Sequence, residues 1–164
     1  MRQRVLFVSI LAASASLANS DVRANPATPP GLEAIVGTFN CVTHESGGTI
    51  WHFHSVNQAW GAWVHVETTF AAQNGQPADE ASVLVGFDAK AKQWNIISAD
   101  SDGSYYTRSS RSQAFDGSHW VDRYPADGAK AVVALRGKRQ YTFDLVSACT
   151  NGRAESSHTV CTRV

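Results

Sequence analysis

The side chains most suited to chemistry lie in one short stretch, Thr49–Glu67, which reads TIWHFHSVNQAWGAWVHVE. It holds three histidines, three tryptophans and a glutamate. His52 and His54 are two residues apart, so on a strand both rings leave the same face. Such a His-x-His pair binds zinc when a third ligand comes from a neighbouring strand, and His65 is the candidate.

The pairing of the two halves of this stretch decides where His65 points. If the turn is centred near Gln58, Trp51 lies opposite His65, and His65 points away from His52 and His54. We therefore favour an interpretation in which the His52 and His54 rings lie outside in water, and a metal site is not favoured.

The same pairing places Trp51, Phe53, Trp63 and His65 on the inner face. Four such side chains form an apolar wall with one polar group, a composition typical of small-ligand pockets. The alternative is that they simply fill the interior of a small barrel.

The elements that must position these residues are strands, because the period of the chain is two and turn residues recur at short intervals. We expect an all-β fold, an antiparallel up-and-down meander of about ten strands closed into a barrel, with a two-sheet sandwich as the alternative. The expected strands are Ala34–Thr43, Thr49–Val56, Gly61–Ala71, Ser82–Asp88, Gln93–Asp100, Ser104–Ser110, His119–Tyr124, Ala131–Arg136, Gln140–Ala148 and Ser156–Arg163.

Alternation also predicts which side chains face inwards. Near the C-terminus, Asp144 should face water, so its neighbours Phe143 and Leu145 should face the interior. By the same rule Phe39 and Cys41 share a face of the first strand. The predicted pocket consists of Phe39, Trp51, Phe53, Trp63, His65, Tyr141, Phe143 and Leu145.

The N-terminal residues have the layout of a secretory signal peptide: arginines, a short apolar run and then small residues. We expect cleavage after Ser20 or Ala24, a proline-rich tether over 25–31 and one barrel domain over 32–164. The apolar run is too short for a permanent transmembrane helix. The expected location is periplasmic or secreted.

Charge excludes one class of partner. The chain has 14 basic and 14 acidic residues, and residues 1–24 hold three of the arginines and one aspartate, which leaves a mature net charge near −2. No lysine-rich run remains, and nucleic-acid binding requires one. A nucleic-acid partner is therefore not expected.

The three cysteines are Cys41, Cys149 and Cys161. An exported chain meets an oxidising compartment, so one disulfide is expected and one thiol is left over. The first and last strands are neighbours in a closed barrel, which favours Cys41–Cys161. The pairs Cys41–Cys149 and Cys149–Cys161 remain open.

Three motifs together resemble a family: LEAIVGTFNC, SVLVGFDAKAKQWNIISADSDGSYY and a final strand ending VCTRV. They resemble the exported, largely uncharacterised bacterial families with a lipocalin-like, nitrobindin-like barrel. The resemblance implies a barrel with an interior cavity. The nitrobindins bind haem through a histidine near the C-terminal strand and act on reactive nitrogen species, and His158 is the positional match. This chain has VGTFNCV where nitrobindins have a fuller G-x-W-x-G-x-G opening.

An interior haem ligated by His158 and an inward Cys41–Cys161 disulfide require opposite orientations of the last strand. If Cys161 faces inwards, His158 faces outwards and cannot be an interior axial ligand. No G-x-S-x-G motif surrounds a serine, and ADSDG is typical of a hairpin turn.

We expect an exported barrel that binds a small, mostly apolar ligand without catalysis. A haem or zinc protein of nitrobindin type, using His158 or the set His52, His54 and His65, is the alternative, and a packed structural envelope protein is the third.

Overall fold

The computed structural model describes residues 30–125, 128–147 and 155–164. Over these residues the chain forms ten antiparallel strands and one short 3-10 helix, η1 (Leu32–Ile35). The strands are β1 (Gly37–Glu45), β2 (Ile50–Trp60), β3 (Trp63–Phe70), β4 (Asp79–Asp88), β5 (Gln93–Asp100), β6 (Tyr105–Ser110), β7 (Ser118–Tyr124), β8 (Lys130–Leu135), β9 (Gln140–Ser147) and β10 (Glu155–Arg163).

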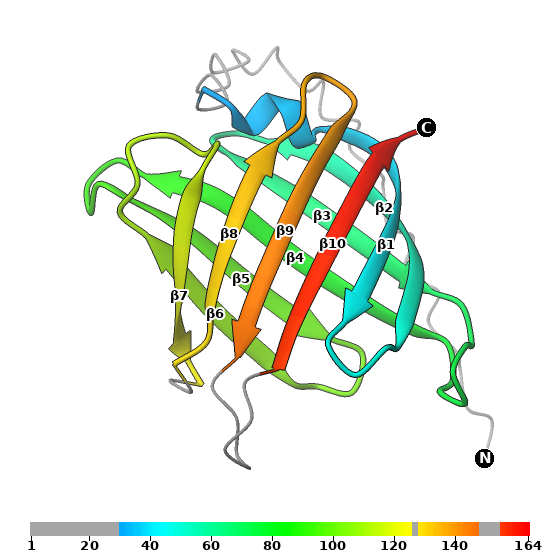
Figure 1. Ribbon diagram of the computed structural model, residues 1–164. Helices are drawn as coiled ribbons and strands as arrows, with labels where there is room; N and C mark the ends of the chain where they lie inside the picture. Colours follow the sequence, from blue (N-terminus) through cyan, green and yellow to red (C-terminus); the bar gives the residue numbers. More distant parts are fainter. Residues whose placement is uncertain (1–29, 126–127, 148–154) are drawn as a thin grey trace, which may run out of the picture.

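Each strand pairs with the next, and β1 pairs with β10 to close the barrel (Figure 1). The predicted all-β meander is therefore confirmed. Closure leaves no sheet edge open to other chains, which is the physical advantage of this architecture. The predicted signal peptide, most of the tether and Cys149 lie outside the described residues.

The first predicted strand is wrong at its start. Residues Leu32–Ile35 form η1 instead, and the strand begins at Gly37. The helical turn brings Leu32 (0% exposed) and Ile35 (3%) onto one side, where both join the main core. Burial of two large apolar side chains at the end of the barrel outweighs the extended pattern seen in the sequence.

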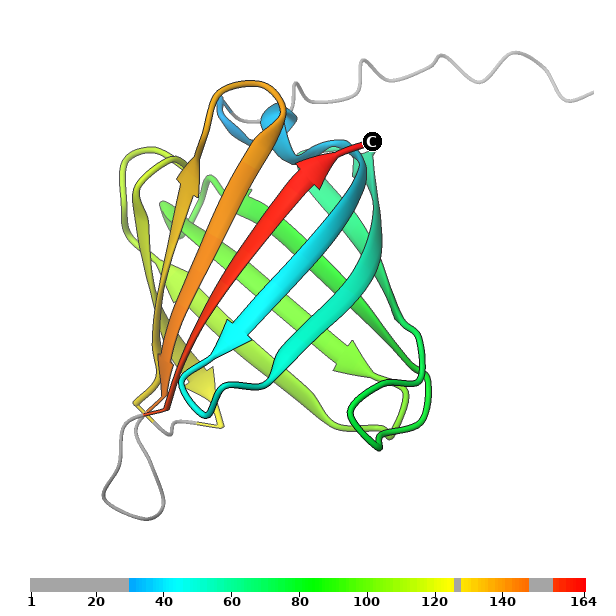
Figure 2. The ribbon, with the colours of Figure 1, turned by 45° about the vertical axis from the view of Figure 1, so that its right-hand side comes forward.

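In Figures 1 and 2, η1 lies across one end of the barrel, and the turns that join β1 to β2 and β3 to β4 lie at the other end. The interior next to η1 is filled. Its buried apolar side chains come from η1, the loop before β7 and five strands, namely Leu32, Ile35, Val64, Val66, Val85, Trp94, Ile96, Phe115, Trp120, Ala131 and Val133.

Arg163, near the end of β10, fixes η1 to the barrel. Its Nη1 donates to the carbonyl of Val36 (2.5 Å) and its Nη2 to the carbonyl of Ala34 (2.9 Å). Its guanidinium carbon lies 4.8 Å from the centre of the Phe39 ring. Gly37 has a φ of 132°, and a Cβ there would collide with the guanidinium. The glycine is thus required both by its own conformation and by the arginine beside it.

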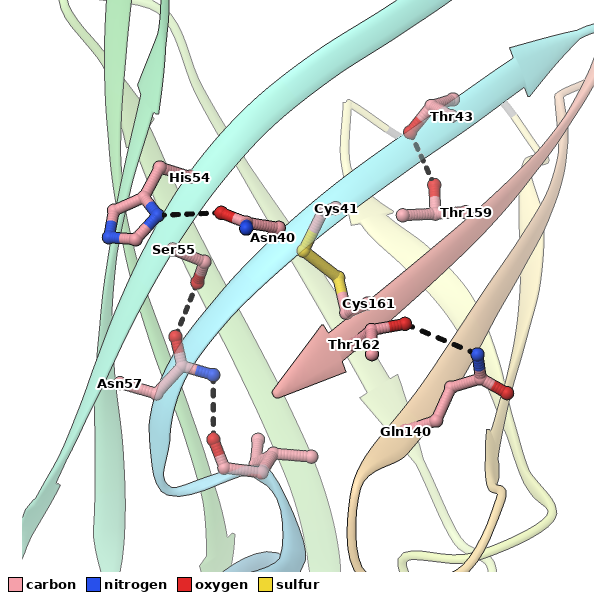
Figure 3. The surroundings of a disulfide bond; sticks show 11 residues. Asn40, Cys41, Thr43, His54, Ser55, Asn57, Gln140, Thr159, Cys161 and Thr162 are labelled. Atoms are coloured by element: carbon pink, nitrogen blue, oxygen red, sulfur yellow. Dashed lines mark hydrogen bonds between the residues drawn. A yellow bond between two sulfur atoms is a disulfide. The ribbon is translucent and has the colours of Figure 1, made fainter. Parts of the chain in front are cut away.

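The disulfide joins Cys41 to Cys161, as favoured by the sequence, and closes the seam between β1 and β10 (Figure 3). The two residues are directly paired across the strands. Both side chains are buried and pack with Phe39, Phe53 and Tyr141. The covalent link therefore lies on the inner face of the barrel.

Candidate functional site

The barrel is hollow at the end opposite η1. A cavity of about 740 Å³ lies there, within the range of about 300–1,000 Å³ usual for small-molecule sites. It is lined by Thr43, Glu45, Trp51, Phe53, Phe70, Gln76, Pro77, Ala78, Asp79, Ser101, Asp102, Tyr106, Arg108, Phe143, Leu145, Ser157 and Thr159.

Four of the eight predicted pocket residues line this cavity: Trp51, Phe53, Phe143 and Leu145. Trp51 and Phe53 come from β2, and Phe143 and Leu145 from β9. On β2 they alternate with exposed residues, as the period of two predicts, whereas on β9 the neighbouring Thr142 is itself buried. Two walls of the cavity therefore come from strands on which the sequence predicted inward side chains.

Phe39 and Tyr141 face the interior but lie deeper, outside the set that lines the cavity. Their rings are in an edge-to-face contact with centres 5.1 Å apart. Both pack beside the disulfide. They belong to the filled part of the barrel rather than to the pocket.

Trp63 and His65 were predicted to face inwards, and this is wrong. The turn between β2 and β3 is at Gly61 and Ala62, so Trp60 pairs with Trp63 and Gln58 with His65. A pairing shifted by an odd number of residues exchanges the two faces of the whole strand. Val64, Val66, Thr68 and Phe70 occupy the interior instead.

The outer positions of Trp63 and His65 are defined by contacts. The Trp63 ring lies against Gly86 of β4, where a Cβ would collide with it. The His65 Nε2 is 2.7 Å from the Ser82 hydroxyl. His65 therefore gives the cavity no polar group.

The polar group of the cavity is one that the sequence analysis missed. Arg108 of β6 and Asp122 of β7 form a buried ion pair between Nε and Oδ1, with side chains 9% and 3% exposed. The Arg108 guanidinium carbon lies 4.3 Å from the centre of the Tyr106 ring and 5.6 Å from that of Phe143. Two aromatic rings thus flank a cation at the cavity wall. The inward facing of Asp122 could have been predicted, because Asp122 shares a strand face with Trp120, but its pairing with Arg108 depends on the register of β6 against β7.

The mouth of the cavity carries carboxylates. Glu45, Asp79 and Asp102 line it and are exposed. Hydrogen bonds from the side chain and backbone of Ser104 lower the pKa of Asp102. The mouth is therefore acidic at neutral pH, whereas the wall inside it holds a charge-balanced pair.

The loop between β3 and β4 is tied to β2 at this mouth. The side-chain amide of Gln73 accepts from the backbone N–H of His52 (2.8 Å) and donates to its carbonyl (2.7 Å). Asn74 donates to the carbonyl of Ile50 (2.7 Å). The last residue pair between β2 and β3 is Phe53–Phe70, where β3 ends. Beyond it, the Gln73 side-chain amide makes the two hydrogen bonds to His52 that the backbone of a neighbouring strand would make.

A buried polar network separates the cavity end from η1. Ser55 donates to the side-chain oxygen of Asn57, and Asn57 Nδ2 donates to the Ile35 carbonyl (2.7 Å) (Figure 3). Burial raises the pKa of Tyr141, while hydrogen bonds with Asn57 and Ser55 act in the opposite direction. These interior polar groups are satisfied by one another and by the backbone of η1.

The histidines of the opening motif lie on the outer surface. His52 and His54 are exposed, as favoured, and His54 Nδ1 is 3.1 Å from the Asn40 side-chain oxygen (Figure 3). His65 pairs with Gln58, four residues along β2 from His54, which is about 13 Å on a strand. Among residues 30–125, 128–147 and 155–164, no three histidines, cysteines or carboxylates are grouped to hold a metal ion.

His158 also lies on the outer surface, where its Nδ1 is hydrogen-bonded to Asp144. Its neighbours on β10, Thr159 and Ser157, line the cavity. An interior haem ligated by His158 is incompatible with this facing.

Within the part of the chain that the structure describes, no helix is long and apolar enough to cross a bilayer. No protein-family model and no curated protein matches the chain.

Among solved structures, the chain is similar to designed β-barrels. A redesigned barrel has a TM-score of 0.49 and 10% sequence identity, covering 81% of this chain and 94% of that one. A de novo fluorescence-activating barrel has a TM-score of 0.48 and 10% identity, covering 81% and 96%. EF1p2_mFAP2b bound to DFHBI has a TM-score of 0.46 and 8% identity, covering 80% and 95%. Similarity of this degree assigns neither a family nor a ligand to the chain.

Proposed function

We propose that the chain is an exported protein that binds a small, mostly apolar molecule inside its barrel, and that it is not a catalyst. The observation that carries this proposal is the cavity of about 740 Å³ at one end of an otherwise filled interior. Its apolar walls are provided by Trp51, Phe53, Phe70, Phe143 and Leu145. A wall of this kind gains free energy when an apolar molecule displaces water from it.

The cavity also bears on the two alternatives. A solid structural barrel requires the interior to be filled throughout, and here only the end next to η1 is filled. A nitrobindin-type haem site requires an inward histidine, and His158 faces outwards. Both observations favour a binding protein. Such a protein would share the barrel and the cavity with the families that the sequence motifs resemble, but not a haem site.

The test is a titration with Nile red, a neutral dye whose fluorescence rises in apolar surroundings. We expect saturable binding of one dye per chain. Trp51→Ala should weaken binding roughly tenfold, because a large aromatic contact in the cavity is lost. Trp60→Ala is the matched control, since Trp60 is 65% exposed at the opposite end of β2.

Two results would contradict the proposal. One is the absence of saturable dye binding to folded protein. The other is equal weakening by Trp51→Ala and Trp60→Ala, which would place the dye on the outer surface. Native mass spectrometry of the exported protein, purified without added ligand, provides an independent check by detecting any molecule that remains bound.

A further inference from the structure

The buried ion pair restricts what the cavity ligand is. Arg108 Nε donates to Asp122, which uses one of the five N–H groups of the guanidinium. Arg108 has no other hydrogen-bond acceptor among the described residues and lines the cavity. Its side chain is only 9% exposed. The guanidinium N–H groups that Asp122 does not use can therefore donate to an acceptor oxygen of a molecule in the cavity.

The aromatic contacts of Arg108 hold this donor group in place. The guanidinium lies over Tyr106, with Phe143 on a second side, and its Nε is fixed by Asp122. A planar guanidinium held at three points loses little conformational entropy when an acceptor oxygen binds.

The charges around the cavity oppose an anionic ligand. Asp122 already balances the charge of Arg108, so a bound carboxylate would add an uncompensated negative charge beside the buried pair. At the mouth, Glu45, Asp79 and Asp102 repel an incoming anion. A neutral acceptor such as a carbonyl oxygen meets the same donors without either cost.

We propose that the ligand is an uncharged apolar molecule with a carbonyl-type oxygen, and that this oxygen accepts hydrogen bonds from the Arg108 guanidinium. This inference rests on the proposed function, because it specifies the ligand of the same cavity. It distinguishes the protein from a carrier of fatty acids or other organic anions.

The test uses three probes with one skeleton: acetylnaphthalene, naphthoate and ethylnaphthalene, substituted at the same ring position. Calorimetric titration should give about tenfold tighter binding for the ketone than for the hydrocarbon, because one charge-assisted hydrogen bond is added. Naphthoate should bind more weakly than the ketone. Raising the salt concentration should reduce that difference by screening the acidic mouth.

The variant that tests Arg108 must leave no unpaired charge inside the barrel. Arg108→Met alone would remove the positive charge that faces the buried Asp122 carboxylate, so the variant is Arg108→Met with Asp122→Asn. It should lose the preference for the ketone over the hydrocarbon while it still binds both. Arg108→Lys keeps a charged donor and should keep part of the preference. Arg123→Met is the control, because Arg123 is exposed on the same strand as Asp122.

The outcomes separate this inference from the proposed function. If all three probes bind equally, or naphthoate binds best, the inference is overturned and the binding function stands. If the double variant keeps the full preference for the ketone, Arg108 is not the donor and the inference is again overturned. If no probe binds to protein shown by circular dichroism to be folded, the proposed function itself fails, and the inference fails with it.

Discussion

At the η1 end of the barrel, inward side chains meet across the axis, whereas at the opposite end they leave about 740 Å³ unfilled. The same strands supply both ends. On β2, Trp51 and Phe53 line the cavity, while Ser55 and Asn57 lie in the buried polar network. The facing alternation is continuous along the strand, and η1 lies across the filled end.

The two ends of the barrel also differ in what their arginines contact. Arg163 donates two hydrogen bonds, to the carbonyl of Ala34 in η1 and to that of Val36 just after it, and so holds η1 across the filled end. Arg108 donates one hydrogen bond to Asp122 and lines the cavity. Stability and binding are therefore expected to separate, with substitutions near η1 changing the free energy of unfolding and substitutions near the mouth changing ligand affinity.

The largest expected effect is loss of the disulfide. The double variant C41S/C161S should lower the free energy of unfolding by about 5 kcal/mol, because the bond closes a loop with a sequence separation of 120 residues. Urea denaturation measures this change. Nile red affinity of the folded variant at low temperature should stay within about twofold, since neither cysteine lines the cavity.

Cys149→Ser is the control for the disulfide variant, because it leaves the Cys41–Cys161 bond intact. A loss below about 1 kcal/mol in the double variant would contradict the stabilising role of the seam bond. A loss of dye affinity without unfolding would contradict the separation of stability from binding.

A matched pair of leucines tests the comparison directly. Leu32→Ala should cost about 3 kcal/mol, because Leu32 is fully buried in the filled end. Leu145→Ala should cost less than about 1.5 kcal/mol, because part of the Leu145 side chain already borders the cavity. For Nile red the order should reverse, with roughly fivefold weaker binding for Leu145→Ala and little change for Leu32→Ala. Equal stability losses would show that both ends are packed alike.

The side of the sheet on which each side chain lies could be predicted from the sequence wherever one strand was considered alone. The alternation around Asp144 placed Phe143 and Leu145 inwards, and both line the cavity. The seam disulfide followed from closure of the barrel and is present. Period and closure are properties of the fold itself, so a sequence pattern carries them.

The prediction of which side chains face inwards was wrong where it depended on the pairing between two strands. The turn lies at Gly61 and Ala62, three to four residues beyond the predicted centre at Gln58. His65 therefore pairs with Gln58 and not with Trp51, a shift by an odd number of residues, and Trp63 and His65 face outwards. A local pattern cannot fix that register, because both pairings keep an alternating strand. The Arg108–Asp122 pair was missed for a related reason, since it needs the register of β6 against β7, which contains an irregularity between Thr107 and Arg108.

Removal of the Arg163 side-chain donors should have an intermediate effect. Arg163→Met keeps an apolar stem over Phe39 but loses the two bonds to the backbone of Ala34 and Val36 and the exposed third bond to the Lys138 carbonyl. We expect a loss of about 2 kcal/mol in the free energy of unfolding and unchanged dye binding. Hydrogen exchange should report earlier opening of η1. Arg136→Met, at an exposed position, should stay within about 0.5 kcal/mol of the unaltered protein.

The smallest expected effect concerns Tyr141, in the polar network between the two ends. Burial raises its pKa, so the folded protein holds the phenol proton more tightly than the unfolded chain. The free energy of unfolding should therefore fall as the pH rises above about 10, where the unfolded tyrosine ionises first. Tyr141→Phe should cost about 1 kcal/mol near pH 8 through the lost hydrogen bonds. Because phenylalanine has no proton to lose, the two stability curves should converge as the pH rises towards about 11. Urea denaturation across this range measures both curves, and parallel curves would mean that Tyr141 ionises as easily in the folded barrel as in the unfolded chain.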